Sequence, residues 1–379
     1  MAKISFKRKR SIRTAAVLVC IMALGTALAS CSRITVGVEQ KVHTKKAKPE
    51  ISSNAVQFKD QAFEKAVRKY FGRNQVLRSD LSHITIIEIT GETLAADGVN
   101  KDDMIKINDQ EYRNIGEIKT FQDLVFFTEL ESLCIGYKPI SDISPLKGMH
   151  KLNTLFLYDT QISDITPLEG LTSLRAFYLD GSKLSDIGPL SGLAELENLY
   201  LNNSLVSDIS ALKALKNIKY LYLYSNVIED ISELKNLSRL EFLSLASNKI
   251  SDISVLEHLS SLEHLDLGNN LISDINILKG LNSLEVLVLS MNKISDISAI
   301  KELSNLELLY LSHNKISDIS ALAGLTALED LDLSHNLISD ISPLKELTGL
   351  KYLSLHNNPL SERDIKELKK ALPNTEIYY

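Results

Sequence analysis

The sequence is poor in the residues on which disulfide-stabilised domains and most enzymes depend. Its 379 residues include no tryptophan and only 3 cysteines, and aromatic residues account for 6%. It contains no P-loop, G-x-S-x-G, H-E-x-x-H or C-x-x-C motif, so no signature of catalysis or metal binding supports an enzyme. Because hydrophobic residues still make up 44%, we expect a core built mainly of leucine.

Positive charge is concentrated in an N-terminal leader. The formal net charge is −6, and the leader contributes only basic residues, with no acidic residue before Cys31. Removal of the leader would leave a still more acidic protein, whereas a nucleic-acid ligand needs a basic patch for its phosphates. The charge therefore argues against a nucleic-acid partner.

What the chain does contain is an 11-residue motif that recurs every 22 residues without insertion or deletion. Its clearest copy, Ser312 to Leu322, reads SHNKISDISAL. The aspartate of this motif recurs at Asp142, Asp164, Asp186, Asp208, Asp230, Asp252, Asp274, Asp296, Asp318 and Asp340. A fixed period of about 20 to 29 residues carrying L-x-x-L-x-L-x-x-N-x-I is the signature of leucine-rich repeats.

One repeat, residues 306–327, predicts the path of a single coil. Three leucines should point inward from a short strand and three aliphatic residues should return along the outside: Leu306, Leu309 and Leu311, then Ile319, Leu322 and Leu325. Because a 22-residue coil leaves little room for a full helix, we expect short 3₁₀ turns on the returning side. The predicted fold is an α/β-type solenoid. It is a curved array with parallel strands on the concave face, 3₁₀ turns on the convex face and a helical cap at each end.

Two polar positions of the repeat have structural explanations. An asparagine after the strand can bond backbone groups that the bend leaves unpaired, at Asn226, Asn248, Asn270, Asn292, Asn314, Asn336 and Asn358. The first four coils carry Lys138, Thr160, Ser182 and Ser204 instead. Since a lysine cannot replace the asparagine, we expect the first coil to be looser. The recurring aspartate is expected to accept N–H bonds at a turn, not to form a catalytic array.

The N-terminus has the pattern of an export signal. Residues 1–14 are basic and 15–28 are apolar, a run too short for a comfortable membrane-spanning helix. The run ends in LASC, residues 28–31, which resembles the lipobox of bacterial lipoproteins. The resemblance implies a signal peptide over 1–30 and a lipid on Cys31 that anchors the protein to a membrane. An ordinary cleaved signal and an uncleaved anchor are the alternatives.

The residues after the leader lack periodicity. We interpret 31–55, which is rich in lysine and serine, as a flexible tether. With Cys20 removed and Cys31 modified, Cys134 is left, and no disulfide can form within the chain. No His-Asp pattern surrounds Cys134, so we expect an inert thiol on the first repeat.

A solenoid needs a cap over its first coil, and we assign 56–129 to it. Asp60 should begin a helix that ends at Phe71, followed by Gly72. Residues 84–89 should then form a strand aligned with the repeats.

Extra residues separate that strand from the first coil. They predict an excursion over 97–113, with a hairpin around Asn108 and Asp109. Its acidic run lacks the ligand spacing of a calcium-binding loop.

The C-terminal end is expected to close the solenoid. Eleven coils over 130–360 are followed by a cap over 361–379, in which Glu362 to Ala371 forms a short amphipathic helix. A last strand should continue the 22-residue register, with Leu372, Thr375 and Ile377 following Leu350, Leu353 and Leu355.

Two segments of the N-terminal cap resemble those of a known protein family. QFKDQAFEKAVRKYFG and SDLSHITIIEITG resemble the cap of internalin-like proteins, and the repeats resemble internalin repeats closely. The resemblance covers Val56 to Tyr379. It implies a rigid curved repeat domain that binds a target, and it does not imply which target. The repeats also resemble those of an intracellular phosphatase-regulating family, an interpretation that the export signal opposes.

Aromatic residues gather on the predicted concave face. The position between the second and third leucine should point outward by the period-2 rule, and four consecutive coils place Phe156, Tyr178, Tyr200 and Tyr222 there. Flanking positions add Tyr137, Tyr158, Tyr220, Tyr224 and Phe242. Exposed tyrosines favour a binding surface, since tyrosine is a common interface anchor. A ladder that packs upon itself is the alternative.

The second half of this face is more polar. Its candidate ligand-binding residues are His264, Asp266, Tyr310 and Asp332. They are accompanied by Asp330, His313, His335, Tyr352 and His356. A hydrogen-bonding surface is the simplest interpretation, although His313 and His335 near Asp332 also allow a zinc site or a pH-sensitive contact.

The sequence as a whole predicts a non-enzymatic binding module tethered to a bacterial cell envelope. We expect it to be exported, to face outside the cytoplasm, to need no cofactor or metal, and to hold a host or envelope protein in its concave face. The alternative is an envelope-structural or adhesion lipoprotein that recognises cell-wall or host glycan. Tyrosines suit both kinds of ligand.

Overall fold

The computed structural model describes residues 54–91 and 103–379. The predicted signal peptide, Cys31, nearly all of the predicted tether and the first part of the excursion lie outside the described residues. Ala55 forms an antiparallel bridge with Leu77, so the described chain joins the fold almost from its start. Within these two ranges, no helix is both long and apolar enough to cross a membrane.

A single 15-stranded sheet runs through the described residues. Its strands are β1 (Ile86–Thr90), β2 (Met104–Ile107), β3 (Gln110–Tyr112), β4 (Ser132–Gly136), β5 (Thr154–Tyr158), β6 (Ala176–Asp180), β7 (Asn198–Tyr200), β8 (Tyr220–Tyr222), β9 (Phe242–Ser244), β10 (His264–Asp266), β11 (Val286–Val288), β12 (Leu308–Tyr310), β13 (Asp330–Asp332), β14 (Tyr352–Ser354) and β15 (Glu376–Tyr378). Strands β4 to β15 are parallel and adjacent in chain order, and β1 lies parallel beside β4. The antiparallel strands β2 and β3 extend the N-terminal edge.

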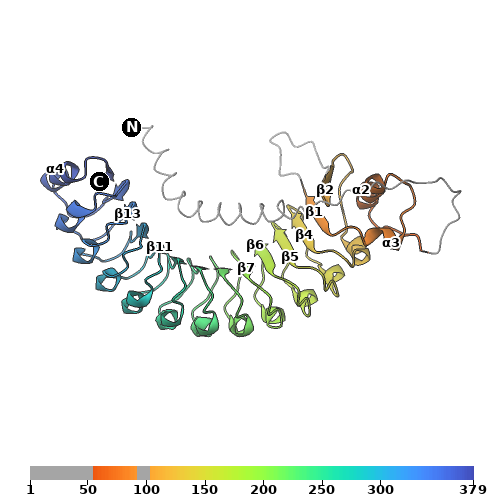
Figure 1. The fold of residues 1–379 in the computed structure, drawn as a ribbon, viewed down its shortest axis with the longest axis horizontal. Coiled ribbons are helices and arrows are strands. Elements are labelled where there is room, and N and C mark those ends of the chain that lie inside the picture. Colours follow the sequence, from red (N-terminus) through yellow and green to blue (C-terminus); the bar gives the residue numbers. More distant parts are fainter. Residues whose placement is uncertain (1–53, 92–102) are drawn as a thin grey trace. The chain divides into compact units, whose positions relative to one another are not determined.

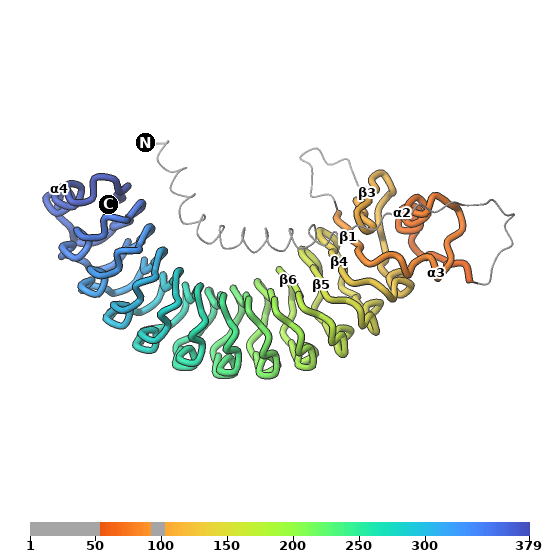
Figure 2. Tube along the Cα trace, viewed as in Figure 1, coloured from red at the N-terminus to blue at the C-terminus, as the bar shows by residue number. Residues whose placement is uncertain are grey.

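Each coil returns through a 3₁₀ turn, as predicted. The turns are η1 (Gln122–Phe126), η2 (Ser144–Leu146), η3 (Thr166–Leu168), η4 (Gly188–Leu190), η5 (Ser210–Ala214), η6 (Ser232–Asn236), η7 (Ser254–His258), η8 (Asn276–Gly280), η9 (Ser298–Ile300), η10 (Ser320–Leu322) and η11 (Ser342–Glu346). Figure 1 shows the coils stacked in an arc with the strands on the inner side and the turns on the outer side, and Figure 2 follows the same arc as a tube. The predicted curved solenoid is therefore confirmed.

The repeated leucines fill one core that runs along the array. In residues 306–327, the six aliphatic side chains of the predicted coil are at most 1% exposed. Burying such a side chain contributes roughly 1.5–3 kcal/mol, which must offset the conformational entropy lost by the whole coil. One coil cannot supply enough, so the coils stabilise one another by stacking.

The asparagine column bonds the backbone as predicted. The side-chain Nδ2 of Asn270 donates to the carbonyl oxygens of Leu245 and Leu267, at 3.0 and 3.1 Å. Its Oδ1 accepts the backbone N–H of Ile250 at 3.0 Å. One asparagine thus joins two neighbouring coils, and the same pattern recurs from Asn226 to Asn358.

The recurring aspartate is a turn residue, also as predicted. Asp318 Oδ1 accepts the backbone N–H of Ser320 at 2.8 Å, where η10 begins. Every other copy makes the equivalent bond. Bonds from the backbone and side chain of Ser320 hold the pKa of Asp318 below its usual value. A carboxylate stabilised in this way caps the turn and is not poised as a general base.

The N-terminal cap contains the predicted helix and a second short one, α2 (Gln61–Phe71) and α3 (Arg78–Leu81). Asp60 caps α2 by accepting the backbone N–H of Phe63 at 3.0 Å. Gly72 ends it with φ of 64°, a conformation in which a side chain is strained. The buried ring of Phe63 packs edge-on against Phe127, with ring centroids 5.5 Å apart, and joins α2 to the core.

The predicted cap strand and hairpin are both present. Strand β1 aligns with the first coil as expected, with Ile87 beside Leu133. Strands β2 and β3 form a hairpin that turns at Asn108 and Asp109, as the sequence predicted. Asn108 has φ of 50°, and its Nδ2 donates to the hydroxyl of Tyr70 in α2 at 2.9 Å, so the hairpin is tied to the cap helix.

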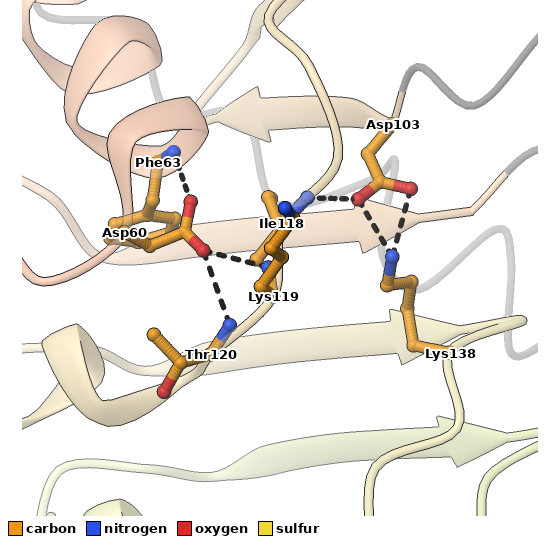
Figure 3. A network of polar contacts seen from close by, with 7 residues as sticks. All are labelled: Asp60, Phe63, Asp103, Ile118, Lys119, Thr120 and Lys138. Atoms are coloured by element: carbon orange, nitrogen blue, oxygen red, sulfur yellow. Dashed lines mark hydrogen bonds and ion pairs between the residues drawn. The ribbon is translucent and has the colours of Figure 1, made fainter.

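The expectation of a loose first coil missed a buried partner for Lys138. Lys138 is 6% exposed, and its Nζ lies 2.8 Å from Oδ2 of Asp103, the first residue of the second described range. Asp103 also accepts the backbone N–H of Ile118 at 2.6 Å (Figure 3). Lys138 therefore occupies the asparagine position of the repeat but forms an ion pair with Asp103, and this ion pair joins the first coil to the cap.

The C-terminal cap contains α4 (Glu362–Ala371), with the predicted bounds. The predicted last strand exists, but its predicted register is wrong. Ile377 lies beside Leu353, not Leu355, and the Thr375 hydroxyl donates to the carbonyl of Leu350 at 2.8 Å. The passage through α4 lengthens this last coil, so extrapolating the 22-residue period fails there.

Candidate functional site

The parallel strands arrange side chains of the concave face in straight rows. Pairing in register places Phe156 beside Tyr178, Tyr178 beside Tyr200, and Tyr200 beside Tyr222. The residues on either side of each of them in the chain, which are leucines apart from Phe177, point into the core and are fully buried. Neighbouring strands are about 4.8 Å apart, close to the thickness that two stacked rings require.

The aromatic ladder, as we define it, consists of Phe156, Tyr178, Tyr200, Tyr222, Phe242 and His264. Its centre is stacked face to face, with ring centroids 4.2 Å apart between Tyr200 and Tyr222 and 4.4 Å apart between Tyr222 and Phe242. At Phe242 the ladder shifts by two residues towards the start of the strand, because the residue paired with Tyr222 is Ser244. The ladder thus crosses six adjacent strands.

The ladder is less exposed than the sequence suggested. Phe156, Tyr178, Tyr200 and Tyr222 retain only 6–8% of their surface. They lie outside the leucine core, and their rings are covered largely by one another. The expectation of solvent-exposed rings is therefore wrong for these four residues. The self-packing ladder, which the sequence left as an alternative, is what forms. A binding role for its outer edge stays a prediction.

The flanking tyrosines differ in exposure. Tyr158 lies over Gly136, where a side chain would collide with its ring, and meets Tyr137 edge-on at a centroid distance of 5.1 Å. Tyr220 donates its hydroxyl to Glu241 Oε2 at 2.9 Å. Tyr137 is 45% exposed and Tyr224 is 41% exposed, so these two are the most accessible of the aromatic residues predicted on this half of the face.

These environments keep the tyrosine hydroxyls protonated. Burial, and then the hydrogen bond to Glu241, raises the pKa of Tyr220 to about 12. Burial also raises the pKa of Tyr158 and of Tyr310. Such hydroxyls donate hydrogen bonds and do not act as phenolate nucleophiles.

In the polar half of the face, the structure brings together Tyr310, Asp330 and Asp332. Tyr310 donates its hydroxyl to Asp330 Oδ2 at 2.8 Å, and Asp332 is 8% exposed and accepts the Ser334 hydroxyl at 2.6 Å. Burial raises the pKa of Asp266 to about 6, although the backbone N–H of Gly268 and the Ser244 hydroxyl oppose the shift.

The two histidines proposed for a metal or pH-sensitive contact lie in a column beside this face. The rings of His313 and His335 are stacked with centroids 3.8 Å apart, and Asn357 Nδ2 lies 2.9 Å from His335 Nε2. Burial and the neighbouring His335 lower the pKa of His313. Across the described ranges, no three His, Cys, Asp or Glu side chains are grouped closely enough to hold a metal ion.

Two features of the site escaped the sequence interpretation. The ladder continues from Tyr222 to Phe242, which occupy different positions of the repeat. Following a single repeat position through the sequence therefore reveals only part of the ladder. A glutamate immediately precedes each strand from β9 to β13, at Glu241, Glu263, Glu285, Glu307 and Glu329. The sequence shows this repetition, but the in-register pairing of the strands is needed to see that the glutamates form a row along the sheet.

Comparison with known proteins agrees with this geometry. The family model described as "Leucine Rich repeats (2 copies)" matches residues 128–170, 194–236, 238–280, 260–302, 282–324, 304–346 and 326–370. An internalin of Listeria monocytogenes, InlF, is 33% identical with a TM-score of 0.74, over 85% of this chain and 88% of that one. The chain belongs to the internalin-like leucine-rich repeat proteins.

Other internalin-like and leucine-rich repeat structures are more distant. A leucine-rich repeat protein of Leptospira interrogans is 26% identical, with a TM-score of 0.61 over 68% of this chain and 74% of that one. The functional domain of InlJ from Listeria monocytogenes, described as including a cysteine ladder, shares the fold at 18% identity and a TM-score of 0.66, over 85% of this chain and 69% of that one. No curated protein matches the sequence. The internalin-like fold is typical of protein-binding domains.

Proposed function

We propose that the chain is an exported lipoprotein that binds a host or envelope protein through the concave face of its repeats and has no enzymatic activity. The observation that carries the proposal is the aromatic ladder from Phe156 to His264, a rigid feature on the face that curved repeat proteins use for binding. Side chains already fixed by stacking lose little further entropy when a partner binds. The likeness to InlF and the export signal support a location outside the cytoplasm.

The geometry favours a protein over a glycan. Sugar rings stack on free aromatic faces, whereas the central faces of this ladder are covered by neighbouring rings. The ladder instead offers ring edges, with the exposed Tyr224 and Tyr137 beside it. Such a surface of edges and hydroxyl groups suits side chains and backbone amides of a polypeptide.

Site-specific photo-crosslinking in cells tests the proposal. A benzoylphenylalanine at Tyr224 should yield a discrete protein adduct, and the same group at Lys235, in the convex turn η6, should not. Equal adducts at both positions, or none at Tyr224, would contradict binding on the concave face. Retention on isolated cell wall without any protein adduct would support the glycan alternative.

The lipid anchor needs a separate experiment. Metabolic labelling with an alkyne fatty acid should mark the wild-type chain, and the label should be lost in Cys31→Ser. Cys134→Ser is the matched control, because Cys134 is buried in β4 and should not be acylated. A Cys31→Ser variant that retains the label would rule out this anchor.

A further inference from the structure

A row of carboxylates borders the concave face where strands β10 to β12 begin. Glu263, Glu285 and Glu307 follow one another on adjacent coils, and the backbone N–H of each donates to the carbonyl oxygen of the glutamate one coil earlier, at 2.8 to 2.9 Å. All three residues are exposed. Among the described residues, none of the three carboxylates has an ion pair or a hydrogen bond.

The ends of the row show what such a carboxylate binds. Lys351 takes the glutamate position in the following coil, and its Nζ lies 2.5 Å from Glu329 Oε2. At the other end, Glu241 accepts the Tyr220 hydroxyl. The row is therefore satisfied at both ends by donors of the protein itself, and its middle is left for donors from outside.

An aliphatic floor lies beside the middle of the row. Val286 pairs with Leu308 across adjacent strands, and Val288 pairs with Tyr310. Val288 and Leu308 are partly exposed on this side of the sheet, and Val286 keeps 9% of its surface. Asp266 lies on the strand before this floor, and Asp330 and Asp332 lie on the strand after it.

No lysine or arginine balances these groups on the same strands, and burial lowers the pKa of the neighbouring His264. The segments 262–266, 284–288, 306–310 and 328–332 contain no lysine or arginine. Carboxylates next to an aliphatic floor match the two parts of a lysine or arginine side chain, because its methylene stem packs on apolar groups while its charged end reaches the acid.

We infer that this sheet face, which carries Glu263, Glu285 and Glu307 beside the floor of Val286, Val288 and Leu308, is the docking surface for a lysine- or arginine-rich segment of the protein partner. The inference rests on the proposed function and gives its partner a chemical class. The aromatic ladder ends at His264, directly beside this surface, so one partner can contact both.

Peptide binding to the full-length protein tests the inference. The probe is a fluorescent peptide of alternating lysine and alanine, followed by anisotropy at low and physiological salt. We expect saturable binding that weakens with salt and falls about fivefold or more in the double variant Glu285→Gln and Glu307→Gln. A peptide of alternating glutamate and alanine should not bind.

The matched control removes the same charge elsewhere. The double variant Glu302→Gln and Glu346→Gln changes two exposed acids on the turn side of the coils, and it should bind like the wild type. Equal losses in both double variants would mean nonspecific attraction to an acidic protein and would overturn the inference, as would no binding at all. Either result leaves crosslinking at Tyr224 unaffected, so the proposed function fails or stands separately.

Discussion

Lys138 Nζ donates to both carboxylate oxygens of Asp103, at 3.1 and 2.8 Å, and both side chains are almost completely buried. The pair joins the first coil to the residue directly before β2, in the N-terminal cap (Figure 3). A buried pair is costly to break because the remaining charge loses its counter-charge without gaining contact with water. This contact therefore makes the cap and the first coil depend on each other.

Replacing one partner should destabilise the N-terminal end strongly. We expect Lys138→Met to cost about 3 to 5 kcal/mol in the free energy of unfolding, since it leaves the Asp103 carboxylate buried without its ion-pair partner. The double variant Lys138→Met and Asp103→Asn should cost less than the sum of the two single changes. Urea unfolding followed by circular dichroism measures each effect.

An exposed ion pair of the β2–β3 hairpin is the control for this experiment. Arg113 and Glu111 are both substantially exposed, so Glu111→Gln should change the stability by about 1 kcal/mol or less. If Lys138→Met had an equally small effect, the buried pair would not hold the cap.

The ladder should stabilise the array independently of any ligand. Tyr200 lies between two rings, with centroids 5.3 Å from Tyr178 and 4.2 Å from Tyr222, and is 6% exposed. We expect Tyr200→Ala to cost about 3 kcal/mol, because it opens a gap between rings that cannot close. Tyr200→Phe keeps the ring and should cost about 1 kcal/mol or less.

Thermal unfolding of these variants separates stacking from exposure. Tyr352 is 48% exposed, and Tyr352→Ala should change the stability by about 0.5 kcal/mol or less. Similar losses for Tyr200→Ala and Tyr352→Ala would show that stacking contributes little. Because ladder variants are expected to lose stability, a binding assay that uses them needs a folding control.

The sequence predicted the fold well where the structure is periodic. A strict 22-residue spacing determines strand, turn and core positions in every regular coil, and local capping chemistry located α2 and α4. It failed where contacts depend on three-dimensional neighbours from other segments. Asp103 lies 35 residues from Lys138, and nothing in the repeat pattern pairs them. The burial of Tyr200 likewise depends on rings of adjacent coils, which a rule for a single strand cannot supply.

Stability should depend on pH through Asp266. Its pKa in the folded protein is about 6, above the ordinary value of 3.8, so the folded state holds the proton more tightly than the unfolded chain. The stabilisation from protonation is complete below about pH 4 and is lost as the pH rises through about 6. We expect Asp266→Asn to be more stable than the wild type at pH 7.5, by about 1 to 2 kcal/mol, and to lose that advantage near pH 4.

An aspartate with the opposite shift provides the comparison. Backbone and side-chain bonds from Ser298 lower the pKa of Asp296, so its contribution to stability is present at neutral pH and lost as the pH falls through its folded pKa. Asp296→Asn should therefore be less stable than the wild type at pH 7.5. At pH 7.5 the urea midpoints of the two variants should shift in opposite directions relative to the wild type, and shifts in the same direction would contradict the assignment of Asp266.

Completing the asparagine column should stabilise the second coil. Thr160 is 6% exposed, and its hydroxyl oxygen has no hydrogen-bond partner among the described residues. In later coils the asparagine at this position bonds carbonyls three and 25 residues earlier, as Asn226 does with Leu223 and Leu201. We expect Thr160→Asn to raise the unfolding free energy by about 1 kcal/mol, because it replaces an unpaired buried group with paired ones.

The reverse change calibrates that prediction. Asn270→Thr removes bonds to two carbonyls and one N–H that the bend leaves otherwise unpaired, and it should cost about 2 to 3 kcal/mol. Both variants keep the leucine core intact, so urea midpoints compare the polar column alone. If Thr160→Asn destabilises the protein while Asn270→Thr behaves as expected, the second coil bends too differently to accept the asparagine, and the column is not interchangeable along the array.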